Sequence, residues 1–211
     1  MNCRLCNSPD TSLLLSDHLH RYHECGQCRV TFADPEGFLA PDVEKSRYDF
    51  HQNDPEDEGY LNFVSQLAGP IQKQLKNGDK GLDYGSGPGP AMQLLFEKEG
   101  WEMECYDPFY LSRAELLEKK YEFITCSETA EHFYNPRAEF EKLWSMLNPG
   151  GLLGIMTLML TDRVDFESWH YRRDDTHVLF YRADTFTWLA GNLKGECEIH
   201  SDRVILLKKP D

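Results

Sequence analysis

The sequence predicts an α/β fold: a doubly wound, mostly parallel sheet that closes with an antiparallel hairpin and is preceded by a small cysteine-rich unit. Three observations support this prediction. Strand-like and helix-like segments alternate from residue 60 onward, as they do where helices cover both faces of a parallel sheet. A glycine-rich turn at residues 85–89 follows the first of these strands. Two C-x-x-C pairs lie between residues 3 and 28, outside any segment with a helical period.

The alternating segments follow one another in a regular order. The predicted strands are short and apolar; they span residues 81–84, 102–106, 123–126, 152–158, 196–199 and 204–207. The predicted helices carry an apolar stripe; they span residues 60–75, 93–98, 136–147 and 186–193. Pro136 suits the first turn of its helix, and the Asn-Pro-Gly-Gly sequence at residues 148–151 ends it. The last two strands form the closing hairpin.

Charge and hydropathy exclude several classes of protein. The 36 acidic and 22 basic residues give a net charge of −14, which repels phosphate backbones and makes a nucleic-acid partner unfavourable. The longest apolar run, Gly151 to Leu160, is too short to span a bilayer, and the N-terminus carries no apolar signal core. We therefore expect a cytoplasmic protein without a membrane partner, in an oligomeric state that the sequence leaves open.

The N-terminal cysteines form two C-x-x-C pairs that are separated by 18 residues. This spacing resembles a four-cysteine zinc ribbon, in which each pair forms a tight knuckle around one tetrahedral ion. The ligands are then Cys3, Cys6, Cys25 and Cys28. The alternative is a set of unmetallated thiols. A structural zinc replaces the core that so few residues cannot build, so we expect a separate zinc ribbon at residues 1–40 that unfolds without its metal and leaves the remainder intact.

The glycine-rich turn reads Asp-Tyr-Gly-Ser-Gly-Pro-Gly from Asp83 to Gly89 and opens a helix, where free backbone N–H groups let a ligand approach closely. A dinucleotide fingerprint needs a third glycine where Pro90 stands. Asp107 lies 22 residues beyond Gly85 at the end of the next strand, where an acid accepts hydrogen bonds from ribose hydroxyls. The pattern indicates a nucleoside-containing cofactor; carboxylates that only stabilise turns are the alternative.

This turn and three later segments, YDPF, ITCSETAEHF and LNPGGLLGIMT, resemble the motif series of class I S-adenosylmethionine-dependent methyltransferases over residues 60–211. The resemblance implies a Rossmann-like methyltransferase sheet with S-adenosylmethionine as cofactor, its methionine part at the glycines, its amino group near Asp83 and its ribose on Asp107. The implied cofactor-binding residues are Asp83, Gly85, Gly87, Gly89, Asp107, Phe109, Ser127 and Glu128.

One departure from the family concerns adenine. Only 13 residues separate Asp107 from Tyr121, which leaves little room for the family's usual third strand and its adenine-contacting acid. Phe109 is our candidate for stacking on the adenine instead.

The segment after the third strand carries an E-x-x-E-H motif, in which Glu128, Glu131 and His132 share one helical face. Two carboxylates and an imidazole suit Mg²⁺, Mn²⁺ or Fe²⁺. The motif is similar to that of ubiquinone-pathway O-methyltransferases and of small-RNA 3′-terminal 2′-O-methyltransferases. In the RNA group a later histidine completes the site, and His177 stands in a similar segment. The alternative is local packing without metal, in which His177 or His132 serves as the catalytic base.

Two further segments are candidates for the acceptor side. Residues 41–59 carry many acids and two prolines, which indicates a linker or lid, and its aromatic residues Tyr48 and His51 with nearby Tyr60 are expected to close over the site. The stretch that contains His170 and Tyr171 follows the fourth strand, where this fold usually builds its acceptor pocket. The alternative is that these rings lie on the surface.

We therefore predict O-methylation of a small-molecule or carrier-bound hydroxyl, with a structural zinc in the ribbon and Mg²⁺ or Mn²⁺ as a possible second ion. Two other functions stay open. One is a terminal 2′-O RNA methyltransferase, which the charge disfavours. The other is a non-catalytic adaptor with a vestigial fold, against which the intact glycine turn and Asp107 argue.

Overall fold

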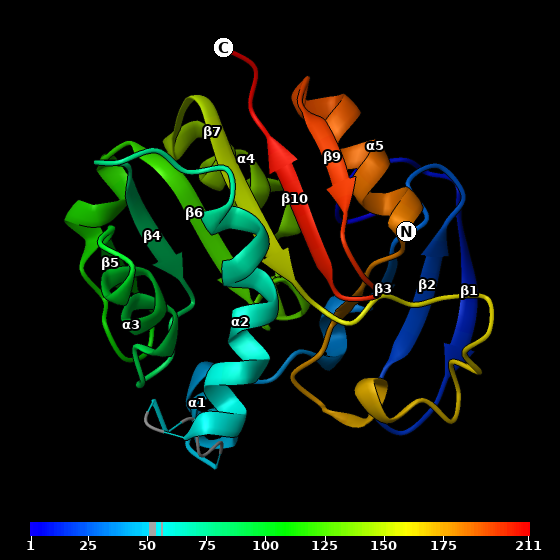
Figure 1. Ribbon diagram of the computed structural model, residues 1–211. Coiled ribbons are helices and arrows are strands. Elements are labelled where there is room, and N and C mark those ends of the chain that lie inside the picture. Colours follow the sequence, from blue (N-terminus) through cyan, green and yellow to red (C-terminus); the bar gives the residue numbers. More distant parts are fainter. Residues whose placement is uncertain (51–53, 56) are drawn as a thin grey trace.

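The computed structural model describes residues 1–50, 54–55 and 57–211. Its centre is a six-stranded sheet with the strand order β5-β4-β6-β7-β10-β9 (Figure 1). These strands are β4 (Lys80–Tyr84), β5 (Glu102–Tyr106), β6 (Tyr121–Ser127), β7 (Leu147–Met156), β9 (Glu196–Ile199) and β10 (Val204–Lys208). Strands β4 to β7 are parallel, whereas β10 pairs antiparallel with both β7 and β9. The mostly parallel sheet and its closing hairpin are confirmed.

The order in which the chain adds strands reverses at β4. Strands β5 and β6 lie on opposite sides of β4, so the carboxyl ends of all three meet at one edge, where open α/β sheets bind their ligands. Between Asp107 and Tyr121 the structure has only the short 3₁₀ helix η2 (Ala114–Glu118), and β5 is the outermost strand. The shortage of room for a further strand is thus confirmed.

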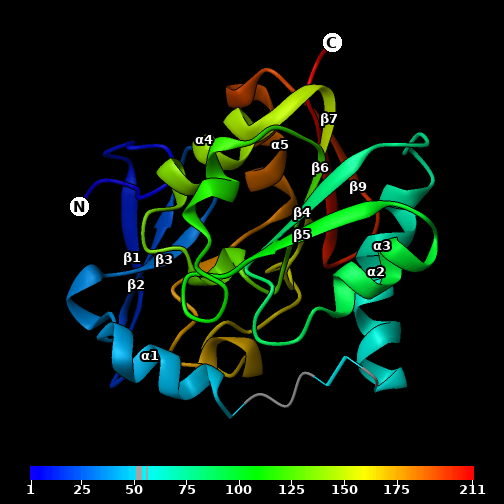
Figure 2. The same ribbon diagram turned by 90° about the vertical axis from the view of Figure 1, so that its left-hand side faces the viewer.

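Helices cover both faces of the sheet (Figure 2). On one face lie α2 (Glu58–Gln72) and α3 (Ala91–Lys98), and on the other lie α4 (Pro136–Met146) and α5 (Ala183–Leu193). Helix α2 begins where the Asp57 carboxylate accepts a hydrogen bond from the backbone N–H of Tyr60 at 2.7 Å. Its apolar stripe then packs on the sheet beside α3.

The N-terminal residues form a second, antiparallel sheet with the order β1-β2-β3-β8. Its strands are β1 (Thr11–Ser16), β2 (Arg21–Cys25), β3 (Thr31–Ala33) and β8 (Leu179–Phe180). Phe32 of β3 pairs with Leu179 of β8, and Tyr22 shares one buried cluster with Phe140 of α4. The expected separation at residue 40 therefore needs correction, because a strand from the later half of the chain completes the N-terminal sheet.

The segment expected as a linker, residues 41–59, contains the helix α1 (Pro41–Tyr48). Pro41 occupies the first helical turn, where its missing N–H costs nothing, and Glu44 is buried. His51, expected in the lid, lies outside the described residues.

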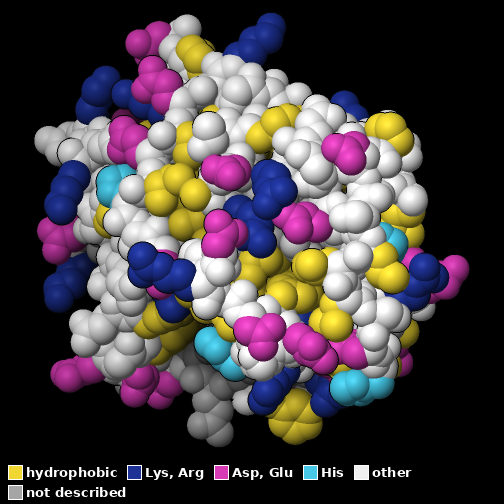
Figure 3. Space-filling model, turned by 90° about the vertical axis from the view of Figure 1, so that its right-hand side faces the viewer, with side chains coloured by type: hydrophobic (Ala, Val, Ile, Leu, Met, Phe, Trp, Pro, Cys, Tyr) yellow, Lys and Arg dark blue, Asp and Glu magenta, His cyan; other side chains and the backbone are white. Residues whose placement is uncertain are grey.

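The face that includes β1 and β2 is partly apolar. Figure 3 shows hydrophobic side chains near its middle, with acidic and basic side chains around them. Leu13 and Leu14 of the edge strand β1 are 55% and 42% exposed.

None of the described helices is long and apolar enough to cross a membrane.

Candidate cofactor and acceptor site

A cavity of about 610 Å³ opens at the carboxyl ends of β4, β5 and β6. Its walls come from the glycine turn, the loop after β5, the segment after β6, and parts of α1 and α2. His177 and Asp174, which precede β8, also line it. This volume is typical of small-molecule sites.

The glycine turn bends sharply away from β4. Gly85 and Gly87 have φ angles of +81° and +64°, a region that disfavours any side chain. A Cβ on Gly85 would also meet the side chain of Thr129 at 2.3 Å. Gly85 and Gly87 line the cavity, whereas Gly89 is buried and is not among its lining residues. The turn thus exposes bare backbone to a ligand at two of the three expected glycines.

Asp107 connects this turn to the loop after β5. One carboxylate oxygen accepts the N–H of Gly87 at 2.9 Å, and the other accepts the N–H groups of Phe109 at 2.8 Å and Tyr110 at 3.1 Å. A carboxylate has about four lone-pair directions, so Asp107 keeps capacity for a further donor. The ring of Phe109 lines the cavity, 5.7 Å from that of Tyr48.

Asp83 is buried in β4, directly before the turn, and is not among the residues that line the cavity. Its carboxylate accepts a hydrogen bond from the Thr125 hydroxyl at 2.7 Å. Burial raises the pKa of Asp83 to about 7; the Thr125 hydrogen bond lowers it, and the charge of Asp107 raises it further. Asp83 therefore titrates near neutral pH in the ligand-free protein.

The acidic residues of the E-x-x-E-H motif both line the cavity. One carboxylate oxygen of buried Glu131 accepts a hydrogen bond from the Tyr171 hydroxyl at 2.5 Å, and the other has no hydrogen-bond partner among the described residues. Burial raises the pKa of Glu131. Burial and the charge of Glu131 raise the pKa of Glu128 to about 8, although Arg203 and Tyr171 oppose the shift.

His132 and His177 lie together in the same wall, with ring centroids 4.8 Å apart. The Nδ1 atom of His132 is 3.0 Å from the carbonyl oxygen of Thr176, and that of His177 is 2.7 Å from the carbonyl oxygen of Tyr171. Because a carbonyl only accepts, Nδ1 carries the proton in each neutral ring and Nε2 keeps a lone pair. Burial and the charge of His132 lower the pKa of His177, so its ring is neutral near pH 7.

Three of the four predicted second-ion ligands approach one another. One ligand atom from each of Glu131, His132 and His177 lies within 4.8 Å of the others. Glu128 is not part of this group. Its φ of +46° lies in the left-handed region, directly after the end of β6. Two imidazoles and one carboxylate are a donor set that divalent transition metals accept.

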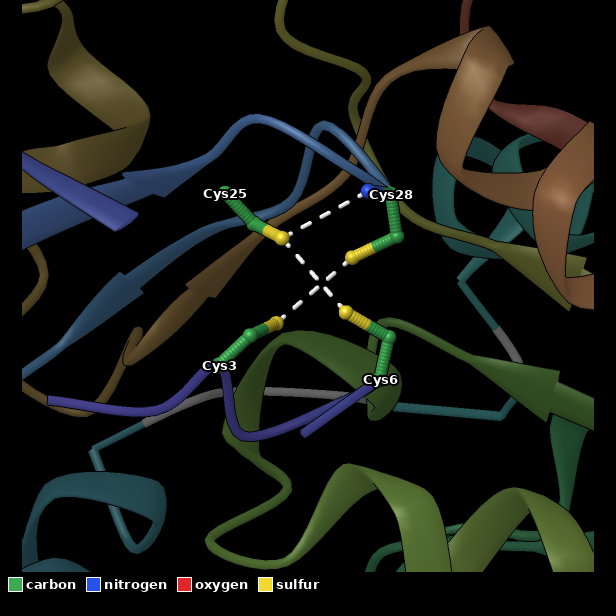
Figure 4. A group of neighbouring side chains, drawn as sticks. All are labelled: Cys3, Cys6, Cys25 and Cys28. Carbon is green, nitrogen blue, oxygen red and sulfur yellow. Dashed lines mark hydrogen bonds between the residues drawn. The ribbon is translucent and has the colours of Figure 1, made fainter. Parts of the chain in front are cut away.

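The four N-terminal cysteines converge on one point (Figure 4). The Sγ atoms of Cys3 and Cys28 are 3.5 Å apart, those of Cys6 and Cys25 are 3.4 Å apart, and all four lie within 4.8 Å of one another. A tetrahedral zinc with bonds of about 2.3 Å separates its sulfurs by about 3.8 Å. The donor set therefore fits a zinc ion.

The two knuckles repeat the same backbone geometry. Asn7 and Arg29, each directly after the second cysteine of a pair, both have φ of +62°. Their N–H groups donate to the carbonyl oxygens of Cys3 at 2.9 Å and Cys25 at 3.0 Å. This repetition supports a site that the two C-x-x-C loops build together.

The N-terminal sheet also supports the wall that contains the histidines. Buried Arg172 donates a hydrogen bond to Asp17 and lies over the Tyr22 ring, 5.4 Å from its centroid. The N–H of Ala33 donates to the carbonyl of Val178 at 2.8 Å, next to His177. The N-terminal sheet and this wall of the cavity are therefore in direct contact.

The remaining predicted residues divide between the cavity and its surroundings. Tyr48, Tyr60 and Ser127 line the cavity. His170 is exposed and does not, because its neighbours in the 3₁₀ helix η4 (His170–Arg173) take up the buried positions. Tyr171 lies behind the wall, where it orients Glu131.

Reasoning from the sequence did not select two other lining residues, Glu44 and Tyr134. Glu44 is only 6% exposed and accepts a hydrogen bond from the Tyr48 hydroxyl at 2.7 Å. The spacing of Glu44 and Tyr48, four residues apart, is a signal only once a helix is known there.

The profile of the family described as "Methyltransferase domain" matches residues 50–193. A search of curated proteins finds no match. Solved structures share the fold at low identity, and at this level the likeness shows the fold alone.

Three of these structures illustrate the range. Burkholderia thailandensis 1,6-didemethyltoxoflavin-N1-methyltransferase, solved with 1,6-didemethyltoxoflavin and S-adenosylhomocysteine, is 11% identical, with a TM-score of 0.59 over 95% of this chain and 100% of that one. An O-methyltransferase family protein from the same organism is 11% identical, with a TM-score of 0.52 over 80% and 63%. Haemonchus contortus phosphoethanolamine N-methyltransferase 2, in complex with S-adenosyl-L-methionine, is 13% identical, with a TM-score of 0.52 over 86% and 62%.

Proposed function

The chain belongs to the methyltransferase-domain family, whose profile covers residues 50–193, and is an S-adenosylmethionine-dependent methyltransferase; from this premise we propose that it methylates a hydroxyl of a small-molecule or carrier-bound acceptor. The observation that carries the proposal is the pair of histidines in the cavity wall, His132 and His177. Their Nδ1 atoms lie against backbone carbonyls, which leaves the Nε2 lone pair of each neutral ring able to take a proton.

The cofactor half of the proposed site is the glycine turn with Asp107. When bound, S-adenosylmethionine supplies a methyl group on a sulfonium, which a nucleophile can displace. Gly85 and Gly87 let the backbone approach the methionine part, and Asp107 has capacity for a ribose hydroxyl. Phe109 offers its ring to the adenine, while Tyr48 and Tyr60 close the cavity from α1 and α2.

The acceptor half provides the base. A hydroxyl must lose its proton as it attacks, and His177 is neutral near pH 7 because burial lowers its pKa. The Asp174 carboxylate lies 3.9 Å from Nε2 of His177 and would stabilise the ring once it is protonated. His132 is the second candidate for this role. Alignment of the hydroxyl with the methyl group supplies the rest of the acceleration.

Incubation of the protein with methyl-labelled S-adenosylmethionine and a metabolite library tests the proposal. We expect label in an alcohol or a phenol. Label in RNA would instead support the terminal 2′-O alternative, which the net charge of −14 disfavours. Failure of the cofactor to bind would favour the non-catalytic adaptor.

Asp83 makes cofactor affinity depend on pH. Its pKa is about 7 in the free protein, and the cofactor's ammonium favours the ionised carboxylate, so the pKa falls on binding. Binding then releases a proton, so affinity should rise as pH increases toward about 7 and fall as pH decreases below it. Calorimetry in two buffers of different ionisation enthalpy measures that proton. The dependence should vanish in Asp83→Asn; a flat affinity in the wild type would contradict the assignment.

We also propose one structural zinc per chain, held by the four N-terminal thiolates. Their convergence and the repeated knuckle geometry support it. Elemental analysis should find one equivalent of zinc, and the metal should be absent from the Cys25→Ser/Cys28→Ser double variant.

A second, divalent ion at Glu131, His132 and His177 is an alternative route to the same deprotonation. If the ion is used, a chelator too weak to remove the thiolate-bound zinc should abolish methyl transfer without changing cofactor affinity, and Mg²⁺ or Mn²⁺ should restore it. Full activity after such treatment would leave the histidine base as the mechanism.

A further inference from the structure

The charged side chains that line the cavity are mostly acidic. Six of its described lining residues are carboxylic acids, and none is a lysine or arginine. The undescribed positions 51–53 and 56 hold no lysine or arginine in the sequence either. The acids are Glu44, Asp107, Glu128, Glu131, Glu139 and Asp174.

Three of these acids have other roles. Asp107 holds backbone N–H groups beside the glycine turn, and Glu128 directly follows β6 on the cofactor side. Glu139 accepts a hydrogen bond from the Tyr84 hydroxyl at 2.5 Å and is paired with Lys142 at 2.9 Å.

The other three, Glu44, Glu131 and Asp174, form no ion pair with a lysine or arginine among the described residues. Glu131 is fully buried, and one of its carboxylate oxygens has no described hydrogen-bond partner. Glu131 and Asp174 both lie close to His177.

Aromatic rings complete the surroundings of these acids. The Tyr48 ring lies 5.2 Å from that of His132 and 5.7 Å from that of Phe109, and its hydroxyl bonds Glu44. Burial and the charges of Glu44 and Asp174 raise the pKa of Tyr48, which indicates that both acids lie near its hydroxyl. Carboxylates beside tyrosine faces stabilise an ammonium by ion pairing and by cation–π attraction.

An anionic group meets the opposite conditions in this cavity. A phosphate or carboxylate would give up its hydration without gaining a basic partner, and it would lie beside several carboxylates. Nucleic acids carry a phosphate on each nucleotide, so the cavity favours a small acceptor without phosphate over a nucleic acid.

Resting on the proposed function, we propose that the acceptor is a small hydroxyl compound that carries a protonated amine and no anionic group, with its ammonium held by Glu44 beside the Tyr48 ring. The amine then anchors the molecule at α1, and its hydroxyl lies toward His132 and His177.

Three probes with one hydroxyphenyl frame test the charge preference: tyramine is cationic, tyrosol neutral and 4-hydroxyphenylacetate anionic. Each is titrated by calorimetry into the full zinc-loaded chain, saturated with S-adenosylhomocysteine. Tyramine should bind at least tenfold tighter than tyrosol, and 4-hydroxyphenylacetate should not saturate. Equal binding of all three, tighter binding of the carboxylate, or no binding of tyramine at millimolar concentration would overturn the proposal.

Two variants test whether Glu44 binds the ammonium group. Glu44→Gln keeps the shape and the hydrogen bond to Tyr48 but removes the charge, so it should weaken tyramine about tenfold and leave tyrosol unchanged. Glu99→Gln removes an exposed acid at the end of α3 and should change neither. If S-adenosylhomocysteine itself fails to bind, the proposed function fails; if it binds and the anionic probe is preferred, only the present inference fails.

Discussion

Replacing Cys25 and Cys28 by serine should lower the thermal midpoint of the whole chain rather than unfold the first forty residues alone. Strand β3, which begins three residues after Cys28, pairs with β8 from the later half of the chain. Cys25 and Cys28 are fully buried in the same cluster as Phe140 and Phe180. Loss of the metal therefore removes support from the central fold, contrary to the expectation of an independent ribbon.

The size of this effect follows from zinc energetics. Structural zinc contributes strongly to folding, and a loss on the order of 5 kcal/mol corresponds to a midpoint lower by about 10–20 °C for a chain of this length. Calorimetric unfolding measures it, and chelation of the wild type provides the same comparison without substitution. Cys197→Ser, at a half-buried cysteine that is not one of the four N-terminal cysteines, is the matched control and should shift the midpoint much less. A variant with an unchanged midpoint, in which only residues 1–40 lose hydrogen-exchange protection, would contradict the shared core.

Asp107→Ala should weaken cofactor affinity by about 10–100-fold, because a charged hydrogen-bond acceptor contributes roughly 1–3 kcal/mol. The substitution removes more than the proposed ribose contact. It also leaves the N–H groups of Gly87, Phe109 and Tyr110 without their acceptor, so the glycine turn and the loop after β5 lose their shared support.

Two variants separate these contributions. Asp107→Asn keeps one acceptor oxygen without the charge, so its affinity should lie between the wild type and alanine. Glu118→Ala removes an exposed acid in η2, outside the cavity, and should change affinity little. Wild-type affinity in Asp107→Ala, measured by calorimetry on folded protein, would refute the role of Asp107.

The central sheet and the glycine turn were predictable because their signals are local. Each strand is a short apolar run. The glycines, together with an acid at the end of the next strand, indicate the turn in which the N–H of Gly87 donates a hydrogen bond to Asp107. The short interval before Tyr121 was enough to predict that the family's usual third strand has little room there. These features depend on residues that are close in the sequence.

The pairing of β3 with β8 was not predictable in the same way. Strand β8 has only two residues, Leu179 and Phe180, and they pair across almost 150 positions. Neither residue pair carries an alternating pattern long enough to indicate a strand. The inclusion of the N-terminal unit in the main core is therefore a tertiary property.

On the acceptor side, the positions of single residues could not be predicted from the sequence either. His170 and Tyr171 are neighbours in a 3₁₀ turn, and without a helical or strand period the sequence does not tell which one faces the site. Glu44 was missed because an acid-rich segment predicts a linker, whereas α1 places this acid in the cavity wall. Packing against the rest of the molecule decides both cases.

Calorimetry of the zinc-loaded wild-type chain with S-adenosylhomocysteine tests the central claim, a cofactor site at the glycine turn and Asp107, most directly. The account predicts one site per chain with a dissociation constant in the micromolar range or below. Absence of binding heat at several temperatures, on protein whose folding and zinc content have been verified, would contradict it.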